Sequence, residues 1–558
     1  MNHRHSSHLM ASVVLLGGAL SAPLIGDQTL PGFANRISGE VLKYHSPDPG
    51  VTSGLLVRSL DAERFIEWET ASVPGNFDGD LMHFVWMFAL QVHPDRHRFT
   101  LSVNGEQWFE FRNPPANDTR DWTLAGPHGA TLRFRATMID RFNDLMGFAI
   151  LSVPRSALTP GQPLRLRVAG ETADSRAWYI TFQAPVTARA ELIARPALVR
   201  DTAGNFQPLI LSITHLDVPV DAVISSSFAP DQRVTLTLGG NRFELRHPEV
   251  TQPENVTVRV RAAGRDLHVL TAAVTPVRRW TVHLVQHTHT DVGYTRPQME
   301  ILPEHLRYID VALDLCDQTD SFPEDARFRW TCEASWPVRE YLRSRTSEQI
   351  DRLRRRVAEG RVEVTAMFLN MSEVMDEAGY AEFVAPVLEF RARDLRVTTA
   401  MQDDVNGVAW CLADYFPAMG IDYLVMGEHG HRALVPFDLP TAFWWESRAG
   451  SRVLAFRADH YMTGNFWGVH TGKVEAVEDE LLRYLENLEK GGYRFDRIAV
   501  QHSGYPTDNS PPSIASCELI RKWNERFVWP QLRSAVGREF PEFVKQHHAA
   551  ELPVHRQA

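Results

Sequence analysis

The chain has 558 residues, which at about 150 residues per domain predicts three to four domains. Hydrophobic residues make up 44% and charged residues 23%, a globular composition that excludes wholesale disorder. Lys and Arg number 58 against 69 Asp and Glu, and the net charge of −11 argues against nucleic acid as the main partner. No apolar run reaches the roughly 20 residues of a membrane span, so we expect none.

Residues 1–26 have the layout of a secretory signal peptide. Arg4 and several His precede an apolar stretch, which ends in the small residues Ser21 and Ala22. A signal peptide would place the protein outside the cell or in the periplasm. The alternative is that the His-rich start is an artificial segment left from cloning, in which case we expect a cytoplasmic protein.

Residues 38–276 have the pattern of an all-β region. Short alternating or β-branched runs recur, such as 98–103, 163–168 and 255–261, and Gly- or Asn-containing turns separate them. This pattern is typical of β-sandwiches and predicts two of them, over residues 38–185 and 186–276. Four aromatic residues could stack on sugars or fill the sandwich core: Trp108, Phe109, Trp178 and Tyr179.

From residue 280 onward, predicted strands alternate with predicted helices. The predicted helices include 304–317, 347–359 with a capping box of Thr346 and Gln349, 378–391 and 474–490. The predicted strands include 280–286, 362–368, 397–402, 421–426, 453–457 and 497–501. Such alternation predicts an α/β barrel-like catalytic domain over residues 280–558, with mostly parallel strands, preceded by the all-β sandwich region.

The most informative motif follows the strand 280–286 directly and reads His-Thr-His-Thr-Asp-Val-Gly-Tyr at residues 287–294. Residues two apart in an extended chain share a face and lie about 6–7 Å apart. His289 and Asp291 can therefore point at one ion, and imidazole with carboxylate is an ordinary zinc ligand set. The alternative is that both are polar caps at the end of a strand.

Two further strand ends carry similar residues. Asp403 and Asp404 follow the strand 397–402, and His502 follows the strand 497–501. Active sites of parallel α/β folds gather at this edge of the sheet. His289, Asp291, Asp404 and His502 could therefore meet in one crevice that suits Zn²⁺, with Mn²⁺ or Co²⁺ as alternatives.

These motifs resemble those of glycoside hydrolase family 38, the retaining α-mannosidases. Its first metal motif reads His-x-His-x-Asp-x-Gly-Trp, and residues 287–294 match it with Tyr294 in place of the Trp. Further similarity lies in residues 327–333, 360–363, 375–378, 404–407 and 419–423, in the same linked order. The resemblance covers the chain from about residue 280 to its end.

The resemblance implies the role of each site residue. His289, Asp291, Asp404 and His502 would bind zinc, and Asp404 would also be the nucleophile that forms a covalent glycosyl-enzyme. Tyr294 would lie beneath the sugar ring. Retaining hydrolysis also needs an acid/base carboxyl about 5–5.5 Å from the nucleophile.

The acid/base residue is less clearly marked. Asp459, at the end of the strand 453–457, is our candidate, with a strand-end salt bridge to Arg457 as the alternative. Glu428, His429 and His431 form another polar loop at a strand end. They either line the substrate pocket or form a hydrated turn.

Three departures from the family bear on the expected function. The Tyr at 294 and the surroundings of His502, where the family has His-His-Asp, suggest a distant branch whose substrate need not be mannose. Members of the family continue into a helical bundle and large β-sandwiches, whereas this chain ends at Ala558 and is expected to lack them.

The leading hypothesis is a zinc-dependent retaining glycoside hydrolase that acts on α-mannosides or related α-linked sugars. The alternatives are a metal-dependent carbohydrate deacetylase, whose metal activates water, and an inactive carbohydrate-binding protein. The expected partner is a carbohydrate substrate. The sequence does not indicate the oligomeric state.

Overall fold

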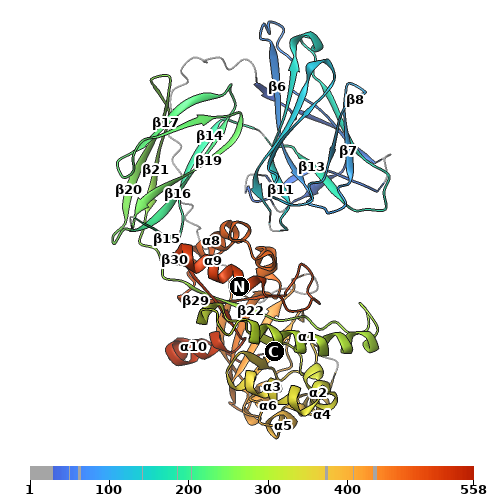
Figure 1. The fold of residues 1–558 in the computed structure, drawn as a ribbon, viewed down its shortest axis with the longest axis vertical. Helices are drawn as coiled ribbons and strands as arrows, with labels where there is room; N and C mark the ends of the chain where they lie inside the picture. Colours follow the sequence, from blue (N-terminus) through green and yellow to red (C-terminus); the bar gives the residue numbers. More distant parts are fainter. Residues whose placement is uncertain are drawn as a thin grey trace, which may run out of the picture.

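The computed structural model describes residues 29–44, 46–48, 51–60, 64–140, 142–184, 186–202, 204–370, 375–405, 407–430 and 437–557. The candidate signal peptide (residues 1–26) and His431 lie outside the described residues. Within them, no helix is both long and apolar enough to cross a membrane. Two all-β units lie beside each other on one side of an α/β part that begins at residue 280 (Figure 1).

The first all-β unit, here called the first sandwich, consists of two sheets. One has the order β3-β4-β13-β6-β11-β10-β9 with β1 beside β6, and the other has the order β2-β5-β12-β7-β8. Their strands are β1 Thr29–Pro31, β2 Asn35–Ser38, β3 Val41–Lys43, β4 Ser53–Arg58, β5 Phe65–Glu69, β6 Leu81–Leu90, β7 Arg98–Val103, β8 Glu106–Arg112, β9 Asp121–Ala125, β10 Thr131–Ile139, β11 Leu145–Pro154, β12 Arg165–Gly170 and β13 Trp178–Phe182.

The core of the first sandwich takes side chains from both sheets, among them Trp68 of β5 and Phe84 of β6. Trp108, Phe109 and Tyr179 belong to this buried core, which confirms the core interpretation of these three aromatics. Burial of large aromatic rings removes much apolar area from water and stabilises the unit.

The second all-β unit, here called the second sandwich, also has two sheets. Its strands are β14 Arg189–Ala194, β15 Leu198–Asp201, β16 Gly204–His215, β17 Val220–Ser226, β18 Gln232–Leu236, β19 Gly239–Pro248, β20 Glu254–Ala262 and β21 Arg265–Val274. The order β18-β17-β20-β21 forms one sheet. The other contains β14, β16, β15 and β19, and it also takes β30 (Phe527–Trp529) from the α/β part. The two parts are therefore joined by a shared sheet.

The α/β part contains ten helices among the described residues. They are α1 Gln298–Gln318, α2 Ser335–Ser344, α3 Ser347–Ala358, α4 Glu377–Val384, α5 Pro386–Arg391, α6 Leu412–Ala418, α7 Thr463–Phe466, α8 Val474–Lys490, α9 Ala515–Arg526 and α10 Glu539–His548. The predicted capping box is confirmed. The Thr346 hydroxyl accepts a hydrogen bond from the Gln349 backbone amide, and the Gln349 side chain accepts one from the Thr346 backbone amide. The helix predicted over 378–391 is instead two helices, since Pro386 starts α5 at its first position.

The strands of the α/β part form three sheets. Their bounds are β22 Thr281–Gln286, β23 Trp330–Cys332, β24 Val362–Val364, β25 Thr399–Asp403, β26 Tyr423–Glu428, β27 Thr441–Glu446, β28 Arg452–His460, β29 Arg497–His502, β31 Gln531–Ala535 and β32 Val554–His555. The sheet orders are β29-β22-β31, β23-β24 and β25-β26-β28-β27-β32. All pairs except β27 with β28 are parallel.

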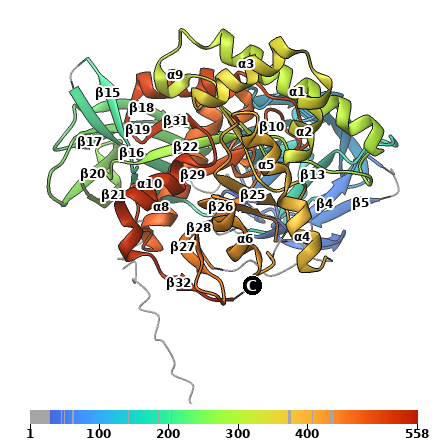
Figure 2. The same ribbon diagram turned by 90° about the horizontal axis from the view of Figure 1, so that it is seen from below.

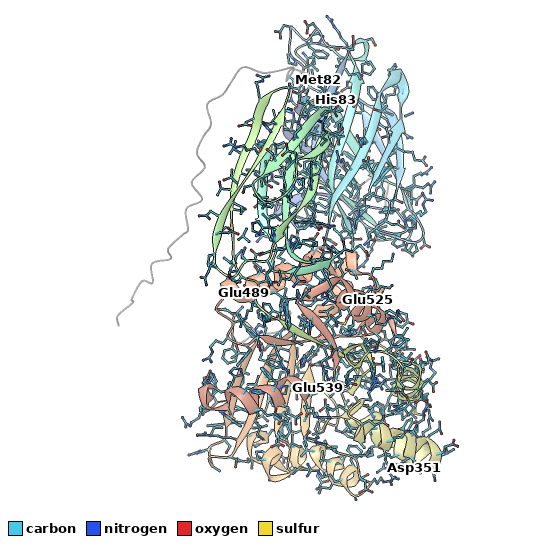
Figure 3. The ribbon with its side chains drawn as sticks, turned by 60° about the vertical axis from the view of Figure 1, so that its left-hand side comes forward. Met82, His83, Asp351, Glu489, Glu525 and Glu539 are labelled. Carbon is cyan, nitrogen blue, oxygen red and sulfur yellow. The ribbon has the colours of Figure 1, made fainter. Side chains whose placement is uncertain are left out.

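The expected barrel is not confirmed. The three sheets stay separate, so the described strands do not close into a barrel. Seen from below, helices such as α1, α3 and α10 surround the strands (Figure 2). Figure 3 shows Met82 and His83 of β6 at one end of the long axis and Asp351 of α3 at the other.

Candidate active site

The polar residues of the α/β part gather where its parallel strands end. His289 and Asp291 follow β22, Glu333 follows β23, Asp404 follows β25, and Tyr461 follows β28. In parallel sheets these carboxyl ends meet at one edge, which is where such folds place their active sites.

Three of the residues indicated by the sequence come together here, and we call them the strand-end cluster: His289, Asp291 and Asp404. One ligand atom from each lies within 4.8 Å of the others. His289 Nε2 is 3.3 Å from Asp291 Oδ1 and 3.9 Å from Asp404 Oδ2. His289 and Asp291 are buried and Asp404 is half-buried, so the cluster is open to a ligand on the Asp404 side.

The backbone at Asp404 turns sharply out of β25. Its φ is +63°, a left-handed conformation that Asp adopts more readily than most residues with a side chain. The Asp404 amide donates to the Gly427 carbonyl at 3.0 Å, which ties this turn to the end of β26. Its Oδ1 is buried and has no hydrogen-bond partner among the described residues.

Glu333 supports the cluster through hydrogen bonds to His287 and His289. It is fully buried, and its Oε1 accepts from His289 Nδ1 at 2.9 Å and from the Thr290 amide at 3.3 Å. Its Oε2 lies 2.5 Å from His287 Nδ1, and Asn370 Nδ2 donates to Oε1. Because an ionised carboxylate only accepts, His289 donates to Glu333 from Nδ1, and this orientation turns Nε2 towards Asp291 and Asp404.

The pKa shifts show a strongly negative electric field. Burial disfavours the protonated form of His289, but the charges of Glu333 and Asp291 outweigh it and raise its pKa well above the usual value. Burial, with the charge of Glu333, raises the pKa of Asp403 well above its usual value. The same negative charge that favours the protonated forms of these side chains also favours a bound cation.

A loop after β29 closes the other side of the cluster. Asn509 donates through Nδ2 to Asp291 Oδ2 at 2.5 Å, and its Oδ1 accepts from the Asp291 amide at 3.0 Å. Tyr461 donates to Asp508 Oδ2 at 3.2 Å, and its ring stacks on His289 at 4.7 Å. Asn509 therefore holds Asp291 through both its carboxylate and its backbone amide.

His502 ends β29 but is not part of the three-residue cluster. Its Nδ1 faces the Ser503 carbonyl at 3.1 Å, and its buried Nε2 has no hydrogen-bond partner within the described part of the chain. Burial lowers the pKa of His502 to about 3, so the imidazole is neutral and can act as a ligand.

The predicted substrate-contacting residues lie at the rim. Tyr294 is 70% exposed, and its hydroxyl donates to Asp291 Oδ1. The His429 ring lies 4.5 Å from the His460 ring, which stacks on Tyr461 at 4.6 Å. A continuous set of rings therefore runs along one side of the cluster.

Asp459, the acid/base candidate, contacts side chains other than those of the cluster. Tyr484 of α8 donates to its Oδ2 at 2.6 Å, and Arg457 lies 3.5 Å from its Oδ1. Glu428, at the end of β26, has its Oε1 3.8 Å from Arg457 Nε. Burial raises the pKa of Glu428 to about 7, which is the range that a general acid needs. Glu428 also shares a cavity with Val405 and Gly407, which follow Asp404.

A family model described as the glycosyl hydrolases family 38 N-terminal domain matches residues 279–558. The chain belongs to this family. No curated protein matches the chain significantly.

Solved structures show weak similarity. An α-mannosidase from Enterococcus faecalis V583 has 15% identity and a TM-score of 0.40, and the match covers 50% of this chain and 30% of that one. A family 38 protein from Enterococcus faecalis has 14% identity and a TM-score of 0.35, with 50% and 28% coverage. A GH2 β-galacturonidase from Eisenbergiella tayi has 9% identity and a TM-score of 0.18, with 71% and 73% coverage. The family 38 assignment therefore rests on the family model, and the chain spans about a third of its first structural relatives.

Sequence reasoning missed several residues of this family 38 site. Glu333 follows the short strand β23, and the same strand-end rule that indicated Asp404 could have found it. Asn509 and Asp508 lie six or seven residues past β29, and neither has a recognisable spacing from the cluster. Only the folded loop brings them to Asp291.

Proposed function

We propose that this family 38 chain is a zinc-dependent retaining glycoside hydrolase that acts on α-mannosides or related α-linked sugars. The observation that carries the proposal is the convergence of His289, Asp291 and Asp404 at the strand ends. The layout of residues 1–26 supports a secreted or periplasmic location.

The donor set fits a zinc ion. One imidazole nitrogen and two carboxylates are ordinary zinc ligands, and the buried Nε2 of His502, which has no hydrogen-bond partner among the described residues, offers a fourth donor. We propose His289, Asp291, Asp404 and His502 as the ligands. When bound, zinc would supply Lewis-acid polarisation and hold the sugar hydroxyls.

The chain's own residues account for the steps at the sugar. Asp404 attacks the anomeric carbon, and an acid/base carboxyl gives its proton to the departing glycosidic oxygen. The bond between Asp404 and the sugar is then broken by a water molecule, which loses its proton to the same acid/base residue. The half-buried position of Asp404, whose Oδ2 lies 3.9 Å from His289 Nε2, supports this role.

The acid/base residue is proposed to come from the group around Arg457. Asp459 is the residue that the sequence indicated, and burial raises its pKa. Glu428 is the second candidate, because its pKa of about 7 leaves it half protonated near neutral pH. Asp459→Asn and Glu428→Gln can be compared on aryl glycosides with good and poor leaving groups. One variant should lose activity mainly on the glycoside with the poor leaving group and regain activity when azide is added. The residue changed in that variant is the acid/base.

Substrate contacts are proposed for the exposed ring of Tyr294, which would lie under the sugar, and for His429. His431 is proposed as a further contact on sequence grounds alone.

The test is metal analysis of the purified chain with a screen of aryl α-glycosides. The proposal expects about one zinc per chain and release of the aryl group from an α-mannoside or a related α-glycoside. Acetate release from acetylated sugars without glycoside cleavage would identify a deacetylase instead. Bound zinc with no turnover of any of these compounds would leave a carbohydrate-binding protein.

A further inference from the structure

We propose that the first sandwich binds a second metal ion, a zinc ion held by His93, Asp95 and His97. These three residues, here called the sandwich triad, lie in the loop that joins β6 to β7. One ligand atom from each lies within 4.8 Å of the others. None of the three belongs to the strand-end cluster, so this ion would stabilise the first sandwich and take no part in the chemistry at Asp404.

The loop folds back on itself and brings the two histidines together. β6 and β7 belong to different sheets of the first sandwich, so the loop crosses from one sheet to the other. The Arg96 amide donates to the His93 carbonyl at 3.2 Å, and the φ of Arg96 is +52°, in the left-handed region. This turn reverses the chain between Asp95 and His97. The rings of His93 and His97 consequently lie 4.8 Å apart.

Both ends of the loop are tied to the chain that follows β8. The His93 amide donates to the Pro114 carbonyl at 2.9 Å, and the Asn113 amide donates to the His97 carbonyl at 3.0 Å. The backbone of the two histidines is therefore fixed before any ion binds. A fixed backbone lowers the entropy that ligand binding would otherwise cost.

Glu171, which follows β12, orients His97. Its Oε1 lies 3.1 Å from His97 Nδ1 and accepts from the Arg98 amide at 3.0 Å, and its Oε2 lies 3.7 Å from Arg98 Nε. Because an ionised carboxylate only accepts, His97 donates to Glu171 from Nδ1 and keeps Nε2 for another partner. A carboxylate behind a histidine in this way is the usual support of a histidine that binds a metal.

His93 and Asp95 offer the other two donor atoms. The Asp95 amide donates to His93 Nδ1 at 3.3 Å, so the lone pair of this nitrogen lies on the side of Asp95. Asp95 Oδ2 is 3.9 Å from the same nitrogen. The Asp95 side chain is 74% exposed, and its carboxylate accepts no hydrogen bond from any residue that the structure describes. The carboxylate can therefore turn towards an ion without breaking a hydrogen bond.

The donor set of the sandwich triad favours zinc. Two imidazoles and one carboxylate are ordinary zinc ligands, and water can fill the fourth position of a tetrahedral ion. Calcium and magnesium prefer oxygen ligands throughout. A polar turn without an ion would account for the contact of His97 with Glu171, but it leaves the Asp95 carboxylate beside a second histidine with no role. A bound zinc would use all three side chains and link the loop, through Glu171, to the end of β12.

The test is equilibrium dialysis of the full chain against zinc at buffered free concentrations, followed by metal analysis. We expect the strand-end cluster to fill first, and about one further zinc per chain to bind at micromolar free zinc. Asp95→Asn and His93→Ala should lack this further zinc. His128→Asn is the matched control, because His128 forms a similar exposed pair with Glu106 at 3.5 Å but belongs to no three-ligand group among the described residues. Asn also suits the φ of +57° at this position.

Thermal unfolding gives a second measurement. An ion that binds only the folded chain raises its melting temperature, so the further zinc should raise that of the unmodified chain and of His128→Asn, but not that of Asp95→Asn. Cleavage of aryl glycosides should be the same in all three chains, since the sandwich triad lies outside the strand-end cluster.

Equal zinc uptake by Asp95→Asn and the unmodified chain would overturn the sandwich triad, because the zinc would then bind elsewhere, for example at the histidines among residues 1–8. Loss of the further zinc in His128→Asn would overturn it as well. If the strand-end cluster binds no zinc, the difference of about one zinc between the unmodified chain and Asp95→Asn should remain. Failure of the proposed function is therefore distinguishable from failure of this second site.

Discussion

Glu333 Oε1 accepts a hydrogen bond from His289 Nδ1 at 2.9 Å. This contact fixes the imidazole orientation and leaves Nε2 pointing at Asp291 and Asp404. Carboxylates that support a ligand histidine in this way also raise its basicity. The orientation of the proposed ligand His289 therefore depends on Glu333.

Glu333→Gln should weaken zinc binding about 10- to 100-fold, because the amide no longer supplies a charged acceptor to both His287 and His289. Competition with a chelator of known affinity measures this. Glu363→Gln is the matched control, since Glu363 is equally buried on the neighbouring strand β24 and contacts Thr399 and Arg538 instead. Equal zinc affinity in Glu333→Gln and the unmodified chain would refute the positioning role.

Asp404→Asn should lower turnover by about 10³-fold or more while the fold persists, since an amide cannot act as the nucleophile. His289→Ala should lose bound metal, because it removes one of the three clustered donors. Circular dichroism checks the fold, and metal analysis and aryl glycoside assays check the losses. Normal activity in Asp404→Asn, or full zinc occupancy in His289→Ala, would contradict the assignments.

Glu428 should make stability depend on pH. Burial raises its pKa from 4.5 to about 7, so between these values the folded chain holds a proton that the unfolded chain has released. The free energy of unfolding should therefore fall, relative to Glu428→Gln, as pH rises from about 4.5 to about 7, and the difference should level off above that. Urea titrations at several pH values measure it. A difference between the two chains that is constant over this range would show that the pKa is not raised.

Gly468→Ala should destabilise the chain more than Gly450→Ala. Both glycines have a positive φ, +87° and +93°, so each Ala costs roughly 1–2 kcal/mol of backbone strain. Only at Gly468 would the new Cβ also crowd Asn143 of the first sandwich and Ala476 of α8, whereas nothing lies within 4 Å at Gly450. We expect a further ~1 kcal/mol from that contact, measured by chemical unfolding. Equal losses would show that the first sandwich does not pack closely on α7.

The sequence predicted the part of the site that follows strand ends. His289, Asp291 and Asp404 could be placed together because parallel strands end at one edge and because each residue follows an apolar run. The long helix α8 was also predictable, since its apolar residues repeat with helical spacing. These features depend on local pattern alone.

Other features depend on packing that no local pattern contains. The pairing of β26 with β28 shifts register between Met426 and Glu428, so the directions of Glu428 and Asp459 could not be read from alternation. Whether strands close into a barrel depends on tilt and stagger, which the sequence does not display.

Trapping with a fluorinated mannosyl fluoride tests the central claim most directly. The mechanism predicts a covalent adduct of one glycosyl unit, which peptide mass spectrometry places on Asp404. It also predicts an α-configured first product from an α-glycoside, visible by NMR. A β-configured first product, or a label on a residue other than Asp404, would contradict the account.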